Sequence, residues 1–294
     1  MERDENVIDL KDLTLFVYSK KLLVLSSTFA FFLLALLYSL SSPNIYQSSS
    51  LLAPANEQDS LSSQLGSYSA LAGLAGVSLP NDATNSTTEA IERIKSFDFF
   101  SVYFLPNISK ENLFALKKWD QESDTLIYNE RFFNASSKKW VIQEPSKLQM
   151  YEKYKKILSI SQDPKTSFVN LSIESPSPKI ARDWLNIIIL NINESMREED
   201  KYVASNSIDF LNENYNNTNL NEIREVISKL LQSQIQTQML ASANKDYIFK
   251  IIDSPQVAEK KSSPKRLLIS LAGILLGLLI SIFYIFGIYI FRED

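Results

Sequence analysis

The chain has 294 residues with a formal net charge of −4, and it contains neither cysteine nor histidine. Disulfide bonds, thiol nucleophiles, zinc sites of the usual ligand sets and histidine base catalysis are therefore excluded. The 30 basic residues are scattered among 34 acidic ones, so no basic patch indicates nucleic-acid binding. We expect no cofactor, no metal site and no nucleic-acid partner.

Two stretches of the sequence are too apolar for ordinary surface or core helices. Leu22–Leu40 contains nineteen residues and Leu267–Phe291 contains twenty-five, and neither carries a charge. As helices they would be ~28 Å and ~37 Å long, against a hydrocarbon core of ~30 Å. Both are predicted to be transmembrane helices. For the first, the alternative is a cleaved signal peptide with Ser39 and Ser41 near the cleavage site, but its length favours a retained anchor.

Basic residues beside the first apolar stretch indicate its orientation. Lys20 and Lys21 precede it directly, whereas the first basic residue after it is Arg93. The positive-inside rule then predicts a cytoplasmic N-terminus and an external region between the stretches. Basic residues just before the second stretch conflict with this, but long loops translocate largely regardless of charge. The predicted order is cytoplasmic segment, transmembrane helix, external domain, transmembrane helix and cytoplasmic tail, at 1–21, 22–40, 41–266, 267–291 and 292–294.

The region at about 178–243 is predicted to be a long helical hairpin. Apolar residues recur at helical spacing from Pro178 to Tyr215 and again from Leu220 to Met239, on either side of an Asn-rich break. Ser177 is expected to cap the first helix with its side chain, and proline suits the first helical position. The first helix alone would be ~57 Å long, which favours a stalk that packs against copies of itself. The alternative is a solvated helix pair within one globule.

The rest of the external domain reads as a mixed α/β base. Val169, Leu171 and Ile173 alternate with polar residues, which predicts a half-buried strand in a hairpin with 157–161. A weak strand at 45–52 and a strand at 247–253 are expected as well, the latter in the same sheet. The sequence further predicts helices at 88–103, 111–119 and 145–156. The expected fold class is an α+β membrane protein, with two transmembrane helices bracketing an α/β base and a helical hairpin projection.

Two further segments have unusual compositions. Leu61–Pro80, which contains Gly73 and Gly76, is small and apolar without charge. We interpret it as a buried loop or a surface that meets a neighbouring subunit, with a low-complexity linker as the alternative. Residues 120–145 read as irregular and rich in aromatic side chains, which fit core packing better than stacking on sugars.

The sequence shows no enzyme motif. Its six glycines are placed so that no phosphate-binding loop or dinucleotide fingerprint is possible, and no Gly-x-Ser-x-Gly elbow exists. We therefore expect a protein that is not an enzyme, although carboxylates brought together by the fold would escape this reasoning.

Two groups of residues near the second apolar stretch are candidates for a role in the membrane. Gly273 and Gly277 lie four residues apart, a spacing that lets helices approach closely in lipid, although it also arises by chance. Their expected partner is the first span or the same helix of a neighbour. The basic residues are candidates for contact with lipid phosphates or a pyrophosphate-linked lipid, and simple anchoring at the headgroups is the alternative: Lys260, Lys261, Lys265 and Arg266.

Taken together, these features resemble the Wzz-type chain length determinants, also called polysaccharide co-polymerases. The resemblance covers nearly the whole chain and is weakest over 104–145. Outside that region it includes Ile-Asp-Leu at 8–10, the Ala-Gly-rich loop at 70–76 and the glycine-containing second span. Its most specific motifs are Phe-Val-Asn-Leu-Ser-Ile-Glu (168–174), Ser-Pro-x-x-Ala (177–181), Asn-Glu-x-Met-Arg (193–197), Ser-Ile-x-x-Leu (207–211), Gln-Met-Leu-Ala (238–241), Tyr-x-Phe-Lys-Ile-Ile-Asp (247–253) and Ser-Pro-Lys-Arg (263–266).

The resemblance implies a bacterial inner-membrane protein with its main domain in the periplasm and no reaction of its own. Members regulate the length of O-antigen or related glycans made by a Wzy-type polymerase on an undecaprenyl-linked carrier, and they form homo-oligomers. Pro255 and Pro264 are expected to contribute to assembly or membrane packing. The family often has proline where this chain has Ser254 and Ala258, which puts the role of the linker in doubt. No Walker motif follows the second span, which argues against the subgroup fused to a tyrosine kinase.

Two other classes of function remain as alternatives. A periplasmic adaptor of a membrane export system would use the helical hairpin to contact an outer-membrane channel, but such adaptors usually have one span and many short strands. A sensor receptor would need a cytosolic output domain, and 292–294 cannot supply one.

Overall fold

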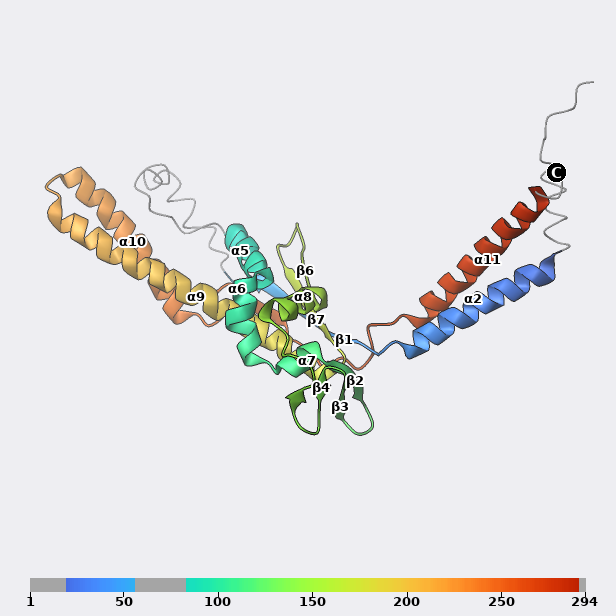
Figure 1. The fold of residues 1–294 in the computed structure, drawn as a ribbon. Helices are drawn as coiled ribbons and strands as arrows, with labels where there is room; N and C mark the ends of the chain where they lie inside the picture. The colour runs from blue at the N-terminus through green and yellow to red at the C-terminus, as the bar shows by residue number, and fades with distance from the viewer. Residues whose placement is uncertain (1–19, 56–82, 291–294) are drawn as a thin grey trace, which may run out of the picture. The chain divides into compact units, whose positions relative to one another are not determined.

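The computed structural model describes residues 20–55 and 83–290. These form two compact units (Figure 1), which we describe separately. One unit consists of Tyr46–Lys260. The other contains the described residues before and after it, up to Ile45 and from Lys261.

A four-stranded antiparallel sheet lies at the centre of the first unit. Its strand order is β6-β7-β1-β8. The predicted β-hairpin is confirmed by the pairing of β6 with β7, and the predicted return strand β8 is confirmed in the same sheet. The strands are β1 (Tyr46–Pro54), β6 (Leu158–Gln162), β7 (Val169–Ser175) and β8 (Phe249–Asp253).

Strand β1, which the sequence signals only weakly, is one of the two central strands. Its inward-facing Ser48 and Ser50 are buried, where an unpaired hydroxyl would be costly. The Ser48 hydroxyl donates to the Gln256 carbonyl at 2.8 Å, and the Ser50 hydroxyl donates to the Asp253 carbonyl at 2.6 Å. These long-range bonds satisfy the serines, and neither is visible in local sequence.

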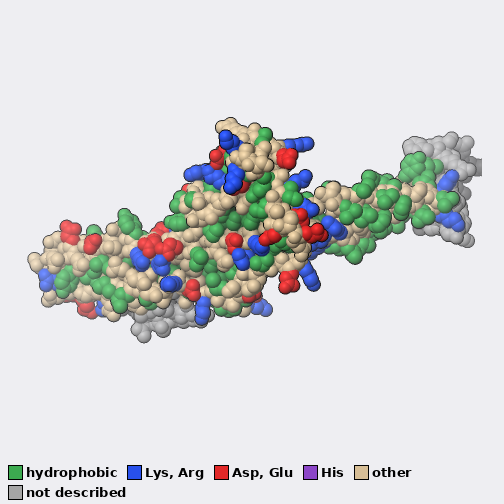
Figure 2. Space-filling model, turned by 90° about the horizontal axis from the view of Figure 1, so that it is seen from below, with side chains coloured by type: hydrophobic (Ala, Val, Ile, Leu, Met, Phe, Trp, Pro, Cys, Tyr) green, Lys and Arg blue, Asp and Glu red, His purple; other side chains and the backbone are tan. Residues whose placement is uncertain are grey.

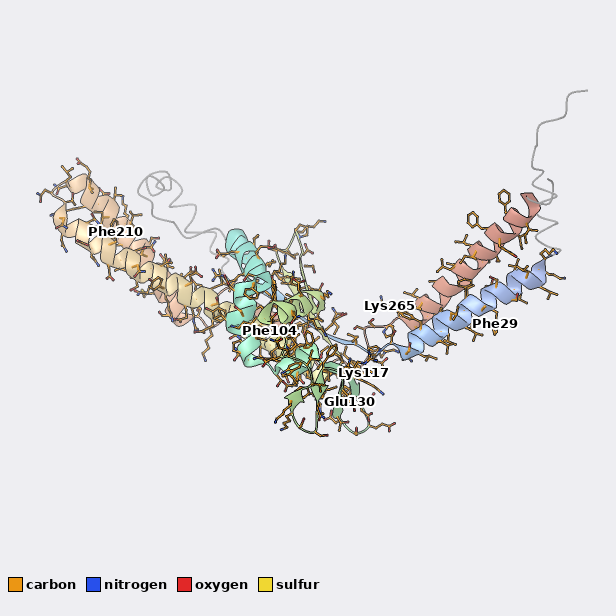
Figure 3. The ribbon with its side chains drawn as sticks, viewed as in Figure 1. Phe29, Phe104, Lys117, Glu130, Phe210 and Lys265 are labelled. Carbon is orange, nitrogen blue, oxygen red and sulfur yellow. The ribbon has the colours of Figure 1, made fainter. Side chains whose placement is uncertain are left out.

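The main hydrophobic core packs helix α9 (Pro178–Asn217) against one face of this sheet. Val169, Leu171 and Ile173 are fully buried, as their alternation predicts. An aromatic cluster that includes Phe104 extends the core (Figure 3). Within it, the Tyr154 hydroxyl donates to the Ile94 carbonyl at 2.9 Å, and burial raises the pKa of this tyrosine.

The predicted helical hairpin is confirmed as α9 and α10 (Asn221–Ala243). Helix α9 has 40 residues, which correspond to a length of ~60 Å. The expected side-chain cap is wrong: Ser177 occupies the capping position, but its hydroxyl makes no capping bond. Pro178 at the start of the helix has no N–H, so one fewer donor needs a partner there.

The predicted continuous helix at 88–103 is wrong in its second half. Helix α5 (Ala83–Lys95) ends before Ser96, whose extended backbone interrupts the helix and whose hydroxyl accepts a hydrogen bond from Phe99 N–H. Three short helical segments follow. They are α6 (Phe97–Phe99), the π-helix η1 (Phe100–Phe104) and the 3₁₀ helix η2 (Leu105–Asn107).

Residues 111–145, which are predicted to be a helix followed by an irregular stretch, contain short strands. Helix α7 ends at Phe114, so the helix predicted to continue to Trp119 is wrong there. The aromatic residues pack on each other, with Phe114 edge-on to Phe132 and to Trp140, which supports core packing. The elements are α7 (Lys110–Phe114), β2 (Leu116–Asp120), β3 (Thr125–Tyr128), β4 (Phe133–Asn134) and β5 (Lys139–Trp140), and the predicted helix at 145–156 is α8 (Lys147–Ile157).

The second unit contains α2 (Lys21–Ser41) and α11 (Arg266–Ile290), which pack against each other. Among the described residues, these two helices are long and apolar enough to cross a membrane by length and composition. They coincide with the predicted apolar stretches, and hydrophobic side chains cover much of their visible surface (Figure 2). That they span a bilayer stays a prediction.

Asn193 on α9 joins the helix to the beginning of β8. Its amide oxygen accepts hydrogen bonds from Ile248 N–H and Phe249 N–H, both at 2.8 Å, and its amide nitrogen donates to the Phe249 carbonyl at 3.0 Å. The side chain is 5% exposed. One buried amide therefore forms hydrogen bonds with three backbone groups at the start of β8.

We predict that Asn193→Ala lowers the free energy of unfolding by about 3 kcal/mol, because it removes three buried hydrogen bonds, each worth about 1 kcal/mol. Urea titration of the full chain in detergent, followed by tryptophan fluorescence, measures this change. The matched control is Asn206→Ala, an exposed position on the same helix, which should change stability by no more than about 0.5 kcal/mol. Equal stability of the two variants would contradict the role assigned to Asn193.

Candidate functional site

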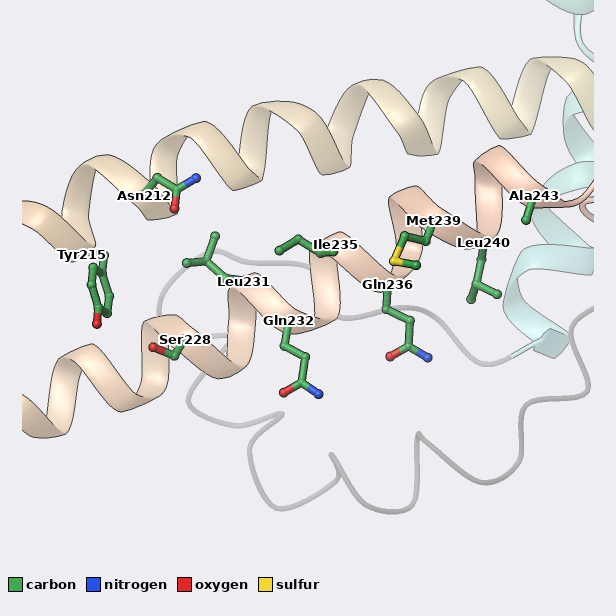
Figure 4. Close-up of a pocket in the computed structure, with 10 residues that line it drawn as sticks. All are labelled: Asn212, Tyr215, Ser228, Leu231, Gln232, Ile235, Gln236, Met239, Leu240 and Ala243. Atoms are coloured by element: carbon green, nitrogen blue, oxygen red, sulfur yellow. The ribbon is translucent and has the colours of Figure 1, made fainter.

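An open groove of ≈ 720 Å³ follows the helical hairpin (Figure 4). Most of its lining side chains lie on one face of α10, and two come from α9. None of the lining residues is charged, so the groove offers no acid or base for chemistry. They are Asn212, Tyr215, Ser228, Leu231, Gln232, Ile235, Gln236, Met239, Leu240 and Ala243.

The groove exists because α10 carries two apolar stripes. One contains Ile227 and Leu230, which are buried against α9 near Leu211. The other contains Ile235 and Met239, which are 44% and 66% exposed. An amphipathic helix with a single helical partner needs only one such stripe. The second stripe is therefore a surface suited to a further helix.

Helix α9 also exposes large apolar side chains along the projecting part of the hairpin. Tyr202, Val203 and Phe210 are each about half exposed or more (Figure 3). Scattered apolar residues are normal on a protein surface, but a series along one projection together with a groove is a candidate interaction surface.

A cluster of charged residues lies at the base of the hairpin. Arg93 on α5 forms ion pairs with Glu89 on its own helix and with Glu199 on α9. The next residue of α9, Asp200, accepts a hydrogen bond from the Tyr247 hydroxyl at 2.6 Å. Burial raises the pKa of the Asp200 carboxyl, although the bond from Tyr247 opposes the shift.

This cluster ties α5, α9 and the approach to β8 together. Among the described residues no group of acidic side chains is arranged to hold a metal ion. Sequence reasoning missed Arg93, Asn193, Asp200 and Tyr247 as joining residues, because their partners are more than 40 positions away. Asn193 and Tyr247 stand out in the sequence only as parts of motifs that carry the family resemblance.

Gly273 and Gly277 lie against α2 of the same chain. A Cβ atom at Gly273 would lie 2.5 Å from the Cβ of Ala35, and one at Gly277 would lie 2.8 Å from the Cα of Thr28. Both distances are below van der Waals contact, so only glycine permits this approach of the two helices. Gly287, in contrast, has nothing within 4 Å of such an atom. A role of the contact in the membrane stays a prediction.

The other residues expected to act at the membrane or in assembly lie in several places. Lys260 and Lys265 are exposed, whereas Lys261 and Arg266 both approach the side chain of Asn44. Pro255 is buried in the first unit, and Pro264 follows Ser263 through a cis peptide bond in the second. Gly73 and Gly76 lie outside the described residues.

Comparison with known proteins gives two sequence matches. The family model described as chain length determinant protein matches residues 6–103, and the model described as G-rich domain on putative tyrosine kinase matches residues 218–288. No curated protein matches the chain.

Two solved structures are among those similar to the chain. One is a full-length bacterial polysaccharide co-polymerase with 12% sequence identity and a TM-score of 0.40. The match covers 98% of this chain and 99% of that protein's chain. The other is a fragment of WzzB, a polysaccharide co-polymerase from Salmonella Typhimurium, with 14% sequence identity and a TM-score of 0.29. The match covers 75% of this chain and 100% of the fragment. Both TM-scores are below 0.5, so the likeness to this family rests on the two sequence matches.

We predict that Gly273→Leu or Gly277→Leu separates α11 from α2 by a few Å, because the added side chain occupies the space of Ala35 or Thr28. The chain has no cysteine, so spin labels on Ser26→Cys and Ile280→Cys report the distance between the helices in nanodiscs. Gly287→Leu is the matched control and should leave the distance distribution unchanged. Identical distributions in all three variants would show that the glycines do not set this contact.

Proposed function

We propose, on the premise that the chain belongs to the family of chain length determinant proteins, that it regulates the length of polysaccharide chains without catalysing a reaction. The observation that carries the proposal is the match of one family model to each end of the chain, together with an apolar helix at each end. The family favours this role over the alternative of an export adaptor.

The proposed location is the bacterial inner membrane, with both apolar helices spanning it. Residues 41–266 then lie in the periplasm, and the short segments at 1–21 and 292–294 lie in the cytoplasm. Two observations support this arrangement. The helices have the length and composition of spans, and Lys20 and Lys21 flank the first one on the side expected to be cytoplasmic.

The proposed active form is a homo-oligomer in which hairpins of neighbouring copies pack side by side. The second apolar stripe on α10 supports this, because one chain leaves Ile235 and Met239 uncovered. A helix from a second copy is a suitable occupant, since the groove is uncharged and follows a helix axis. Gly73 and Gly76 are proposed to contribute to the same assembly.

In this proposal the partners are a Wzy-type polymerase and its undecaprenyl-linked glycan. The oligomer acts as a scaffold, and its geometry biases when extension stops. The uncharged groove supports a scaffolding role, because neither acid–base nor nucleophilic chemistry is available from its lining residues.

We predict that the double variant Ile235→Glu, Met239→Glu weakens self-association by about 100-fold or more, because it places unpaired carboxylates in an apolar contact. Mass photometry of the purified complex measures the subunit number. Gel analysis of surface polysaccharide from cells carrying only the variant should show a ladder without its modal band.

The matched control is Asn206→Glu, which adds a carboxylate at an exposed position of α9 outside the groove. It should keep both the oligomer and the modal band. An intact oligomer of the double variant would contradict the groove as the assembly surface. An unchanged ladder after deletion of the whole gene would contradict the function itself.

A further inference from the structure

In the second unit, the backbone that follows α2 is hydrogen-bonded to the backbone that precedes α11. Ile45 follows α2, and Ser262 and Ser263 precede α11. The Ile45 N–H donates to the Ser263 carbonyl at 2.9 Å, and the Ser262 N–H donates to the Ile45 carbonyl at 2.8 Å. The Ser262 hydroxyl adds a third bond to the same Ile45 carbonyl at 3.1 Å. These bonds fix the backbone directly after Asn44.

Asn44 brings two cations together. The amide oxygen of its side chain lies 3.4 Å from Nζ of Lys261 and 3.3 Å from Nη2 of Arg266. Both distances are long for hydrogen bonds from a charged donor, since charge-assisted bonds are normally about 2.7–2.9 Å. A neutral amide oxygen therefore holds the two cations in position without neutralising either of them.

The positive charge at this place has no acidic partner in the described residues. With residues 20–55 and 83–290, none of Lys261, Lys265 and Arg266 forms an ion pair. In addition, Nε of Arg266 is buried and makes no hydrogen bond within the part of the chain that the structure describes. The chain itself covers this nitrogen, so an external anion would meet the accessible parts of Lys261, Lys265 and Arg266, whose unbalanced positive charge favours such an anion.

The position of these cations identifies the kind of anion. Arg266 is the first residue of α11, and Lys265 lies directly before it (Figure 3). At the end of a membrane-spanning helix, this is the depth of the lipid headgroups. The planar guanidinium matches the oxygens of a phosphate, and lysine adds a flexible point charge.

We propose that Asn44, Lys261, Lys265 and Arg266 form a binding site for the headgroup phosphate of an anionic membrane lipid. The site rests on the proposed insertion of α11 in the bilayer and does not depend on the role in chain-length control. Lys260 belongs to the other unit, so it is not counted in the site.

The test is native mass spectrometry of the full chain in detergent, titrated with phosphatidylglycerol. Arg266→Gln should lower the affinity for this lipid roughly tenfold, because it removes a charge-assisted bond. Asn44→Asp should cause a similar loss, because the new carboxylate pairs with Lys261 and Arg266 and takes the place of the phosphate. Asn44→Asp is nearly isosteric, so the test does not depend on Arg266→Gln folding well.

Each variant has a control with the same change of charge. Lys260→Gln matches Arg266→Gln, and Ser41→Asp at the exposed end of α2 matches Asn44→Asp. Both controls should bind phosphatidylglycerol within about twofold of the unaltered chain, since diffuse surface charge contributes little at moderate salt. Equal losses of lipid affinity in the variants and the controls would overturn the specific site and indicate non-specific electrostatic attraction.

Two further measurements complete the test. The first distinguishes a lipid phosphate from free phosphate, and the second tests membrane insertion by itself. Inorganic phosphate at the same concentration should not displace phosphatidylglycerol, and displacement would overturn the lipid as the ligand. Carbonate extraction of membranes tests insertion by itself. Release of the unaltered chain into the soluble fraction would refute the membrane premise, whereas a normal polysaccharide ladder with lost lipid binding supports the site as a separate property.

Discussion

The antiparallel pairing of β1 with β8 is the constraint on which the rest of the structure depends. β1 follows the first apolar helix in the sequence, and β8 precedes the second. Their register places Leu52 opposite Ile251 and Pro54 opposite Phe249, so the first and last strands of residues 46–260 are neighbours. In the other unit, the bonds between Ile45 and Ser262–Ser263 hold the two chain segments together beside the helices.

Helix α9 connects this constraint to the proposed function. Its first half is buried on the sheet through residues such as Leu185 and Ile188, and Asn193 fastens it to β8. Beyond Asp200 the helix leaves the core, and among the described elements it packs on α10. Helix α9 has 40 residues and is anchored at one end, and the exposed stripe of α10 is the surface proposed for contact with other copies.

The parts of the fold that sequence predicts are those with long or strict periodicity. The two apolar helices, the helical hairpin and the alternation of β7 are of this kind. Short elements were predicted less well, because their conformation is decided by distant contacts. Ser96 ends α5 by adopting an extended conformation in a segment whose apolar residues keep helical spacing, and β2 forms only because β3 pairs with it.

The candidate sites, too, are predicted from the sequence only where they do not depend on distant contacts. Glycine spacing identified Gly273 and Gly277, but only the structure shows that they contact α2 of their own chain. The basic residues before α11 were visible in the sequence, whereas Asn44 gave no signal, since its partners lie more than 200 positions away. The second stripe of α10 was part of the helical pattern, but its exposure follows from the packing of α9.

The central claim is that both apolar helices cross one bilayer, with residues 46–260 on its outer side. The most direct test is Lys165→Cys, which places a single cysteine at an exposed position of the β6–β7 turn in a chain that otherwise has none. Cells with a permeabilised outer membrane and an intact inner membrane are treated with a membrane-impermeant maleimide. We predict full labelling of Cys introduced at this position, and labelling only after lysis of the inner membrane would contradict the claim.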